Sequence, residues 1–164
     1  MICACTLQAT ATGKQPRLTD DELMTLVQKQ TFRYFWDFAH PESGLARERS
    51  NDRLEIATIG GSGFGVMAII VGVERGFITR EQGAERLLKI VEFLNKADSY
   101  HGIWAHWMDG ATGKTIPFSR KDDGADLVES AFMFEGLLAA HQYFTHDNPT
   151  ENRIRGLINT LWHQ

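Results

Sequence analysis

The chain has 164 residues, of which 43% are hydrophobic and 23% are charged, and its formal net charge is −4. This is enough for one globular domain with a core, and the composition excludes an intrinsically disordered chain. The sequence has no basic stripe, which argues against nucleic acid as a partner, and no apolar run near the roughly 18 residues that a membrane span needs.

The N-terminal segment is small and weakly apolar, and it holds both cysteines, Cys3 and Cys5. Two cysteines this close make a poor disulfide, and they complete no metal-binding set with other residues. A leader for export or lipid attachment would have a basic start and a longer apolar core. We therefore expect residues 1–18 to be a flexible tail or leader remnant, and residues 19–164 to form the domain.

Helix signals recur along the chain, and no convincing strand pattern is present. Thr19 and Glu22 form a capping box that predicts a helix from residue 20 to about residue 39. Its apolar residues are expected to face the core: Leu23, Leu26, Val27, Tyr34, Phe35 and Phe38.

Two further helices flank a short turn. The glycine-rich stretch at 60–65 opens a helix to residue 74 that is almost free of charge, so we expect it to be buried on all sides. Gly76 ends that helix, and Thr79 with Gln82 starts an amphipathic helix to about residue 97.

The last two helices are predicted at 124–144 and after Asn148 and Pro149. Each buried helix is thus followed by an amphipathic one. This order predicts an all-α fold that is part of an α/α toroid, with inner and outer helices in alternating hairpins. The loops at 41–59 and 98–123 are long, which places the function on their side of the molecule.

Three acids, Asp122, Asp126 and Glu129, stand at positions i, i+4 and i+7 of the fourth predicted helix. On one helix they would lie within an arc of about 60°. Apolar residues occupy the rest of that helix, so we expect it to be buried nearly all round, with the three acids pointing into a pocket.

Helix capping offers a structural explanation for two of these acids. With Asp123 as the N-cap, Asp126 would stand at the third helical position and Asp122 would benefit from the helix dipole. Capping does not explain Glu129. Three neighbouring carboxylates repel one another, so one of them is expected to keep its proton, as glycoside hydrolysis requires.

Large aromatic side chains precede the acids in the sequence: Trp104, His106 and Trp107. They can serve as loop anchors packed on the core, or as a platform on which sugar rings stack, and the sequence leaves both open. Zinc binding by His101 and His106 is disfavoured, because no third ligand of the usual kind accompanies them.

Four other residues are candidates for substrate binding. Arg47 and Arg49 form either solvated salt bridges or contacts to hydroxyls and carboxylates in the pocket. The glycines at 60–65 lack the Lys-Ser/Thr ending and the preceding strand of a phosphate loop. We expect them to let a helix start close to the pocket, with Ser62 as N-cap and Phe64 lining the site.

Three long motifs, FRYFWDFAHPESGLARERS, GGSGFGVMAIIVGVERGFITREQ and GIWAHWMDGATGKTIPFSRKDDGADLVESAF, resemble a bacterial glucoamylase-like family that includes the endo-β-1,2-glucanases of glycoside hydrolase family 144. The resemblance implies an (α/α)6 toroid, cofactor-free inverting hydrolysis of a β-glucan, and a periplasmic or cell-surface location. It also implies a catalytic role for Asp122, Asp126 and Glu129, and subsites lined by residues such as Phe64, Trp104, His106 and Trp107.

Length separates this chain from that family, because six hairpins need far more residues. We therefore expect an incomplete form with little activity of its own and with faces that promote self-association. A carbohydrate-binding protein without catalysis is the alternative function. A helical-repeat interaction module is disfavoured, because the predicted helix starts show no fixed period.

Overall fold

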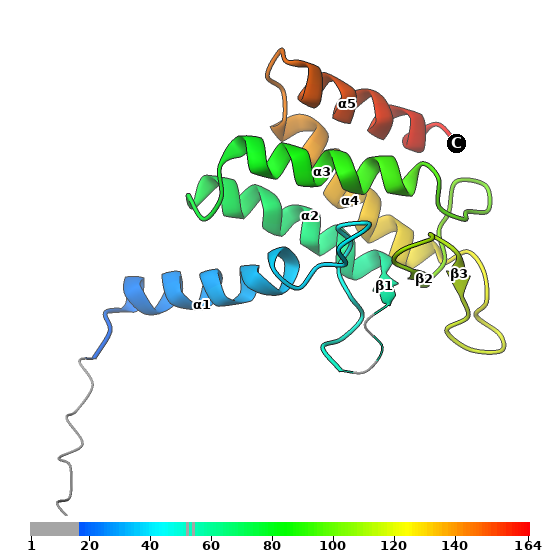
Figure 1. The fold of residues 1–164 in the computed structure, drawn as a ribbon, viewed down its shortest axis with the longest axis horizontal. Helices are drawn as coiled ribbons and strands as arrows, with labels where there is room; N and C mark the ends of the chain where they lie inside the picture. Colours follow the sequence, from blue (N-terminus) through cyan, green and yellow to red (C-terminus); the bar gives the residue numbers. More distant parts are fainter. Residues whose placement is uncertain (1–16, 52, 54) are drawn as a thin grey trace, which may run out of the picture.

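The computed structural model describes residues 17–51, 53 and 55–164, so most of the predicted tail, with both cysteines, lies outside the described residues. The elements in chain order are α1 (Asp20–Trp36), β1 (Ile56–Thr58), α2 (Ile59–Glu74), α3 (Arg80–Leu94), β2 (Trp107–Asp109), β3 (Thr115–Ile116), α4 (Leu127–Tyr143) and α5 (Pro149–Trp162) (Figure 1). Within these ranges, no helix is both long and apolar enough to cross a membrane.

The helices form two layers, with α2 and α4 packed side by side and α3 and α5 packed against each other above them (Figure 1). The predicted caps start three helices as expected, since Thr19 with Glu22 and Thr79 with Gln82 form capping boxes and Asn148 accepts from the amide of Glu151. The predicted order, in which a mostly apolar helix is followed by an amphipathic one, is confirmed for the hairpins α2–α3 and α4–α5.

Glycine permits an unusually close approach between α2 and α4. A Cβ atom added at Gly63 would lie 2.2 Å from the carbonyl oxygen of Phe132, and one added at Gly136 would lie 2.5 Å from the carbonyl oxygen of Gly63. Any larger residue at either position would push the two backbones apart. The two glycines thus set the spacing of the layer that carries the acidic residues.

The burial predicted for α2 and α4 is wrong for part of each helix. Phe64, Met67 and Val71 are exposed on α2, and Leu127 and Leu138 are exposed on α4. These helices are apolar, as predicted, but an apolar composition does not show whether other parts of the chain cover every face of a helix.

Helix α1 differs from its prediction in a similar way. Its buried residue is Phe32, which packs against Gly72, whereas Leu23, Leu26 and Val27 are 45–50% exposed. Figure 1 shows why, because α1 extends away from the two layers and only its C-terminal half lies against α2. The apolar stripe therefore has no matching surface within the described part of the chain.

The predicted all-α fold is confirmed in that the described residues are mostly helical, but they also contain strands that the sequence did not indicate. Strands β1, β2 and β3 form a small antiparallel sheet in that order, with Thr58 opposite Trp107 and Met108 opposite Thr115. These strands have only two or three residues each, too few to show an alternating pattern in the sequence. The sheet joins the two long loops and lies at the end of the layers where α2 and α4 begin (Figure 1).

Replacing Gly63 with alanine should destabilise the fold by about 1–3 kcal/mol, because the new methyl group would collide with backbone atoms of α4. Gly156→Ala is the matched control, because a Cβ atom there meets nothing within 4 Å and α5 should gain about 0.5–1 kcal/mol. Urea unfolding of both variants measures the difference. Equal stability of the two variants would contradict the close approach of α2 and α4.

An ion pair between a buried carboxylate and a partly exposed guanidinium joins α3 to α5. Arg80, at the start of α3, donates two hydrogen bonds of 2.9 Å to the carboxylate of Glu151, at the start of α5. Burial alone would raise the pKa of Glu151, but hydrogen bonds from Arg80, His146 and Asn148 outweigh it and hold the pKa below its usual value. Arg80 also lies over the rings of Tyr143 and Phe144.

Glu151→Gln should lower the free energy of unfolding by about 1–3 kcal/mol near neutral pH, because it leaves the partly buried Arg80 charge poorly paired. Since the folded pKa of Glu151 is depressed, its contribution exists above the unfolded pKa and disappears as pH falls through the folded pKa. The difference in free energy of unfolding between wild type and Glu151→Gln, measured by urea unfolding, should therefore become smaller at acid pH.

Asp98→Asn provides the control for this experiment, because the Asp98–Lys114 pair is solvent-exposed and its loss should lower the free energy of unfolding much less than Glu151→Gln does. If the difference in free energy of unfolding between wild type and Glu151→Gln stayed constant from neutral pH to strong acid, the Arg80–Glu151 pair would not stabilise the fold in the way described.

Candidate functional site

The three acids do not form the predicted row on one helix. Helix α4 begins at Leu127, so only Glu129 is helical, while Asp126 is the N-cap and Asp122 lies in the preceding loop. The alternative with Asp123 as N-cap is wrong as well. Asp126 adopts an extended backbone, with φ −117° and ψ 111°, because its amide donates to the carbonyl of Trp104 at 2.8 Å.

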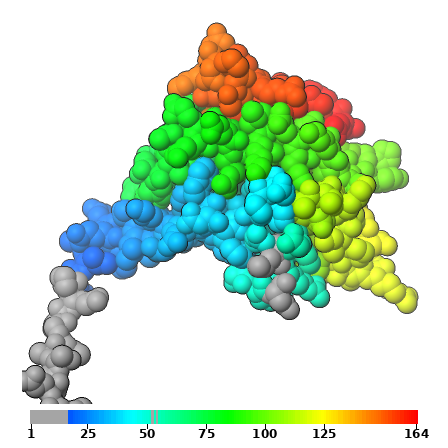
Figure 2. All heavy atoms as spheres, viewed as in Figure 1, coloured from blue at the N-terminus to red at the C-terminus, as the bar shows by residue number. Residues whose placement is uncertain are grey.

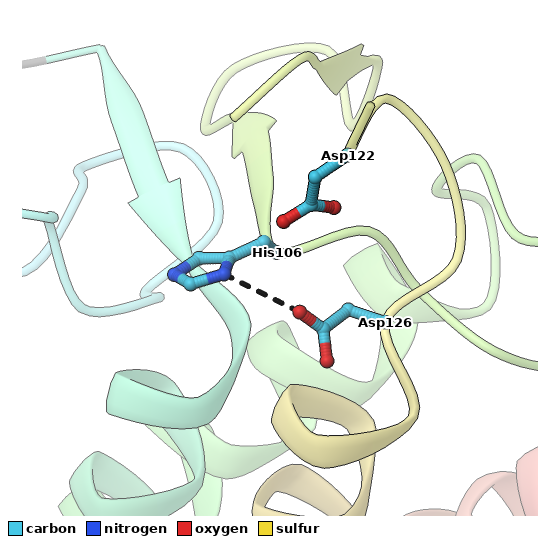
Figure 3. A group of neighbouring side chains, drawn as sticks. All are labelled: His106, Asp122 and Asp126. Atoms are coloured by element: carbon cyan, nitrogen blue, oxygen red, sulfur yellow. Dashed lines mark ion pairs between the residues drawn. The ribbon is translucent and has the colours of Figure 1, made fainter. Parts of the chain in front are cut away.

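Tertiary structure nevertheless brings the acids together, around the ring of His106. Its Nδ1 lies 3.3 Å from Oδ2 of Asp126, and its Nε2 lies 3.9 Å from Oε1 of Glu129. Asp122 belongs to the same group, and Figure 3 shows its carboxylate beside His106 and Asp126. We call His106, Asp122, Asp126 and Glu129 the acidic cluster.

Each of two carboxylates in the acidic cluster has one oxygen committed to structure. Oδ1 of Asp126 accepts from the amides of Val128 and Glu129 at 2.9 and 3.0 Å, which caps α4. Oε2 of Glu129 accepts from the amide of Gly60 at 2.8 Å. The other oxygen of each carboxylate faces His106, so both side chains are fixed in place and each keeps one oxygen without a backbone hydrogen bond.

Glu129 has a structural role that the sequence did not predict. Among the described residues, the N-cap Thr58 makes no side-chain cap for α2, and Glu129 supplies the acceptor from the neighbouring helix. Gly60 is required here, because a Cβ atom would lie 2.5 Å from Oε2 of Glu129. Glu129 therefore joins the two inner helices at the end where the acidic cluster lies.

Trp104 and Trp107 are both buried, as expected for residues that anchor a loop to the core. Trp104 is 1% exposed and lies 4.9 Å from the ring of Phe134, and Trp107 is 7% exposed within β2. Of the two alternatives that the sequence left open, the burial of both indoles favours packing on the core over a stacking platform.

The aromatic surface at the cluster comes from Phe118, which sequence reasoning missed. Its ring is 46% exposed and stacks on His106 at 4.2 Å with an angle of 22° between the planes, and it also contacts Trp107 at 4.7 Å. The available signal was a lone phenylalanine in a polar loop four residues before Asp122. A role in the site can be assigned to such a residue only when the side chains next to it in the folded structure are known.

The structure assigns different roles to Ser62 and Phe64. Ser62 is buried, donates to the carbonyl of Thr58 at 2.6 Å and accepts from the amide of Ala46 at 2.8 Å, so it is not the N-cap of α2 but a link to the first long loop. Phe64 is 56% exposed and packs against Phe132 at 5.2 Å, one turn beyond Gly60. It extends the apolar surface near the cluster.

The two arginines lie in the first long loop as expected. Arg49 is half exposed and pairs with Glu48 at 2.8 Å, which is the solvated salt bridge. Arg47 donates from Nε to the carbonyl of Phe38 at 3.0 Å, and its guanidinium lies 5.1 Å from the centre of that ring. These contacts anchor the loop to the end of α1.

The acidic cluster also has the ligand types of a metal site. One atom each from His106, Asp122 and Asp126 lie within 4.8 Å of one another. The sequence shows no third ligand of the usual kind beside His101 and His106. The two aspartates become neighbours of His106 only because the loop before α4 folds over that ring. Partly exposed acids often lie this close without an ion, so the geometry by itself does not define a metal centre.

Comparison with known proteins finds that the chain is similar to part of several longer proteins, some of them named as glucan hydrolases. No family model matches the chain. An exo-β-1,2-glucooligosaccharide sophorohydrolase of Parabacteroides distasonis is 53% identical over 146 residues, which is 88% of this chain and 20% of that protein. The chain therefore spans about a fifth of the curated relative that it matches.

Two solved structures give the same result. A protein of Bacteroides uniformis described as a "putative glucoamylase" is 83% identical, with a TM-score of 0.89, over 90% of this chain and 36% of that one. An endo-β-1,2-glucanase from Chitinophaga pinensis, in complex with sophorotriose and glucose, is 52% identical, with a TM-score of 0.86, over 89% and 37%. The resemblance found in the sequence is confirmed, and the chain is homologous to part of these proteins.

Substitutions at Asp126 should separate its capping role from its chemistry. Asp126→Asn keeps a good N-cap and should change stability by less than about 0.5 kcal/mol, whereas Asp126→Ala should cost about 1 kcal/mol. Thermal unfolding monitored by circular dichroism compares the two variants. If alanine and asparagine proved equally stable, the assignment of Asp126 as the cap of α4 would have to be withdrawn.

Proposed function

We propose that this chain is part of a glycoside hydrolase that acts on a β-1,2-linked glucan by an inverting acid/base mechanism. The observation that carries the proposal is the acidic cluster, in which Asp126 and Glu129 each direct one carboxylate oxygen toward His106 and bind a backbone amide with the other. The relatives named for β-1,2-glucan or its oligosaccharides support the substrate class.

Inverting hydrolysis needs one carboxyl group that protonates the leaving oxygen and one carboxylate that activates water. Asp126 and Glu129 are the candidates, because their anchored oxygens hold them in place without occupying the second oxygen. Asp122, whose carboxylate lies next to Asp126 and His106, would adjust the charge of the pair. The assignment of acid and base between Asp126 and Glu129 stays open.

Substrate binding would use the exposed aromatic rings around the cluster. Phe118 presents one face to His106 and leaves nearly half of its surface open, and Phe64 with Phe132 continues the apolar surface along α2 and α4. Aromatic rings of this kind suit the apolar C–H faces of glucose units, while the hydroxyls would bond to the carboxylates and His106.

The complete domain would be the (α/α)6 toroid, of which α2–α5 supply two hairpins. Exposed apolar residues on the inner helices, and coverage of only 36% and 37% of the solved relatives, support this proposal. The chain alone is accordingly expected to hydrolyse glucan weakly or not at all. Export to the periplasm or cell surface stays a prediction.

A chimera tests the proposed function in a complete domain. Residues 17–164 replace the matching segment of the Bacteroides uniformis relative, and a reducing-sugar assay follows hydrolysis of β-1,2-glucan. Glu129→Gln should lower kcat at least about 100-fold, because it removes an acid/base group. Calorimetry with sophorotriose should show an affinity within about threefold of the unsubstituted chimera, since binding contacts remain.

Glu85→Gln, on the exposed side of α3, is the control and should leave both measurements unchanged. An active chimera that keeps its full rate with Glu129→Gln would eliminate Glu129 as a catalytic group. A chimera that binds sophorotriose without hydrolysing glucan would favour the alternative, a carbohydrate-binding protein without catalysis, which should also tolerate Asp126→Ala.

A further inference from the structure

We propose that Asp123 is a site of spontaneous modification, where the amide nitrogen of Gly124 closes a succinimide ring that reopens to isoaspartate. The site lies in the loop between Asp122 and Asp126, two members of the acidic cluster. The modification is a property of this loop, so it does not depend on the reaction that the acidic cluster performs.

The chemistry needs an aspartate followed by a residue whose amide nitrogen can reach the side chain. The nitrogen forms a bond to Cγ of the aspartate, and the hydroxyl of the carboxyl group leaves with the amide proton as water. Water then adds to the ring and breaks one of its two C–N bonds. Breaking the bond to the backbone carbonyl carbon leaves the main chain running through Cγ, which is isoaspartate, and breaking the other restores aspartate. Glycine favours closure because it has no Cβ atom and its backbone turns freely.

The sequence has the Asp-Gly dipeptide twice, and the structure closes the first of the two to this reaction. The amide of Gly110 donates to the carbonyl of Glu55 at 2.8 Å, and Oδ1 of Asp109 accepts from the amide of Thr112 at 2.7 Å. Gly110 is buried, and a Cβ atom there would lie 2.6 Å from the ring of His40. Both reacting groups are held in other contacts, so ring closure at Asp109 requires local unfolding.

The second dipeptide, Asp123–Gly124, is open to the reaction. Both of its residues are exposed to solvent. Within the described part of the chain, the amide of Gly124 donates no hydrogen bond, and the carboxylate of Asp123 has no hydrogen bond or ion pair. A Cβ atom at Gly124 would meet nothing within 4 Å, so there is space for the ring.

Isoaspartate at this position would lengthen the main chain by one carbon atom beside the acidic cluster. The loop is held on both sides, because the carbonyl of Asp122 accepts from the amide of Phe118 at 2.8 Å and Asp126 is the N-cap of α4. Only residues 123–125 lie between these anchors. The ring of Phe118 stacks on His106 at 4.2 Å, so a displacement of Asp122 would reach the aromatic surface of the site.

Ageing of purified chain 1–164 at body temperature in heavy-oxygen water tests the proposal. Each succinimide that reopens takes up one heavy oxygen atom, which mass spectrometry detects after trypsin digestion in ordinary water. Electron-transfer fragmentation separates isoaspartate from aspartate, and the peptides 97–114 and 122–153 carry the two dipeptides separately. In the folded chain, label and isoaspartate should accumulate at residue 123 at least about tenfold faster than at residue 109, because closure at residue 109 requires local opening.

Two controls show whether the folded structure and the glycine decide the rate. In the chain unfolded in guanidinium chloride, the two dipeptides should react at rates within about threefold of each other, because both glycine amides are then free. Gly124→Ala should slow the reaction at residue 123 at least about tenfold, because the methyl group hinders the nitrogen and restricts the backbone. This variant should fold like the wild type, since its added Cβ atom meets nothing within 4 Å.

The effect on the acidic cluster is followed by proton NMR of the His106 ring, whose signals are assigned by their loss in His106→Asn. They should shift in the aged wild type, because Phe118 moves relative to the ring, and stay in place in aged Gly124→Ala. Isoaspartate without a shift of these signals would overturn the effect on the acidic cluster.

Three results would overturn the modification itself: no label at residue 123 under conditions in which the unfolded chain reacts, equal rates at residues 109 and 123 in the folded chain, or a reaction in Gly124→Ala as fast as in the wild type. None of these measurements uses glucan, so their outcome is separate from the success or failure of the proposed function.

Discussion

The close contact between α2 and α4 is the constraint on which the rest of the structure depends. Gly63 and Gly136 bring the two backbones together, and this spacing places Glu129 against the amide of Gly60. Gly60 is one turn before Gly63, and Glu129 is two turns before Gly136, so both lie at the same end of the layer. There the small sheet and the folded loop add His106, Asp126 and Asp122. The acidic cluster is therefore a consequence of helix packing.

This origin explains how Glu129 and Asp126 can combine a structural role with the chemical role that we propose for them. Glu129 uses one oxygen to satisfy the start of α2, and Asp126 uses one oxygen to satisfy the start of α4. A carboxylate held in this way loses rotational freedom before any ligand arrives, which is the preorganisation that acid/base catalysis requires. Capping and catalysis are thus not competing interpretations of these acids, because each carboxylate has two oxygens.

The exposed apolar residues fall into groups with different surroundings. Phe118, Phe64 and Phe132 lie near the acidic cluster and are flat rings suited to sugars. Leu127 and Leu138 lie on the side of α4 that faces away from α2, and Trp162 lies at the end of α5. Arg80 and Glu151 join α3 to α5 at one end of their layer. Figure 2 shows this body as continuous, with α1 projecting from it. The side of α4 that faces away from α2 is exposed to solvent, whereas the contact between α2 and α4 is buried.

The sequence by itself determined the helices, their order, the caps of α1, α3 and α5, and the residues of the acidic cluster. Caps and helical periodicity are local, so adjacent residues decide them. It also indicated the family, through motifs that the relatives share. It did not determine the sheet, the burial of Trp104 and Trp107, or the place of Phe118, and its helical row of acids was wrong. Tertiary structure alone decided these, because each depends on contacts between residues far apart in the chain: the strand pairing of Thr58 with Trp107, and the approach of Glu129 to Gly60 across two helices.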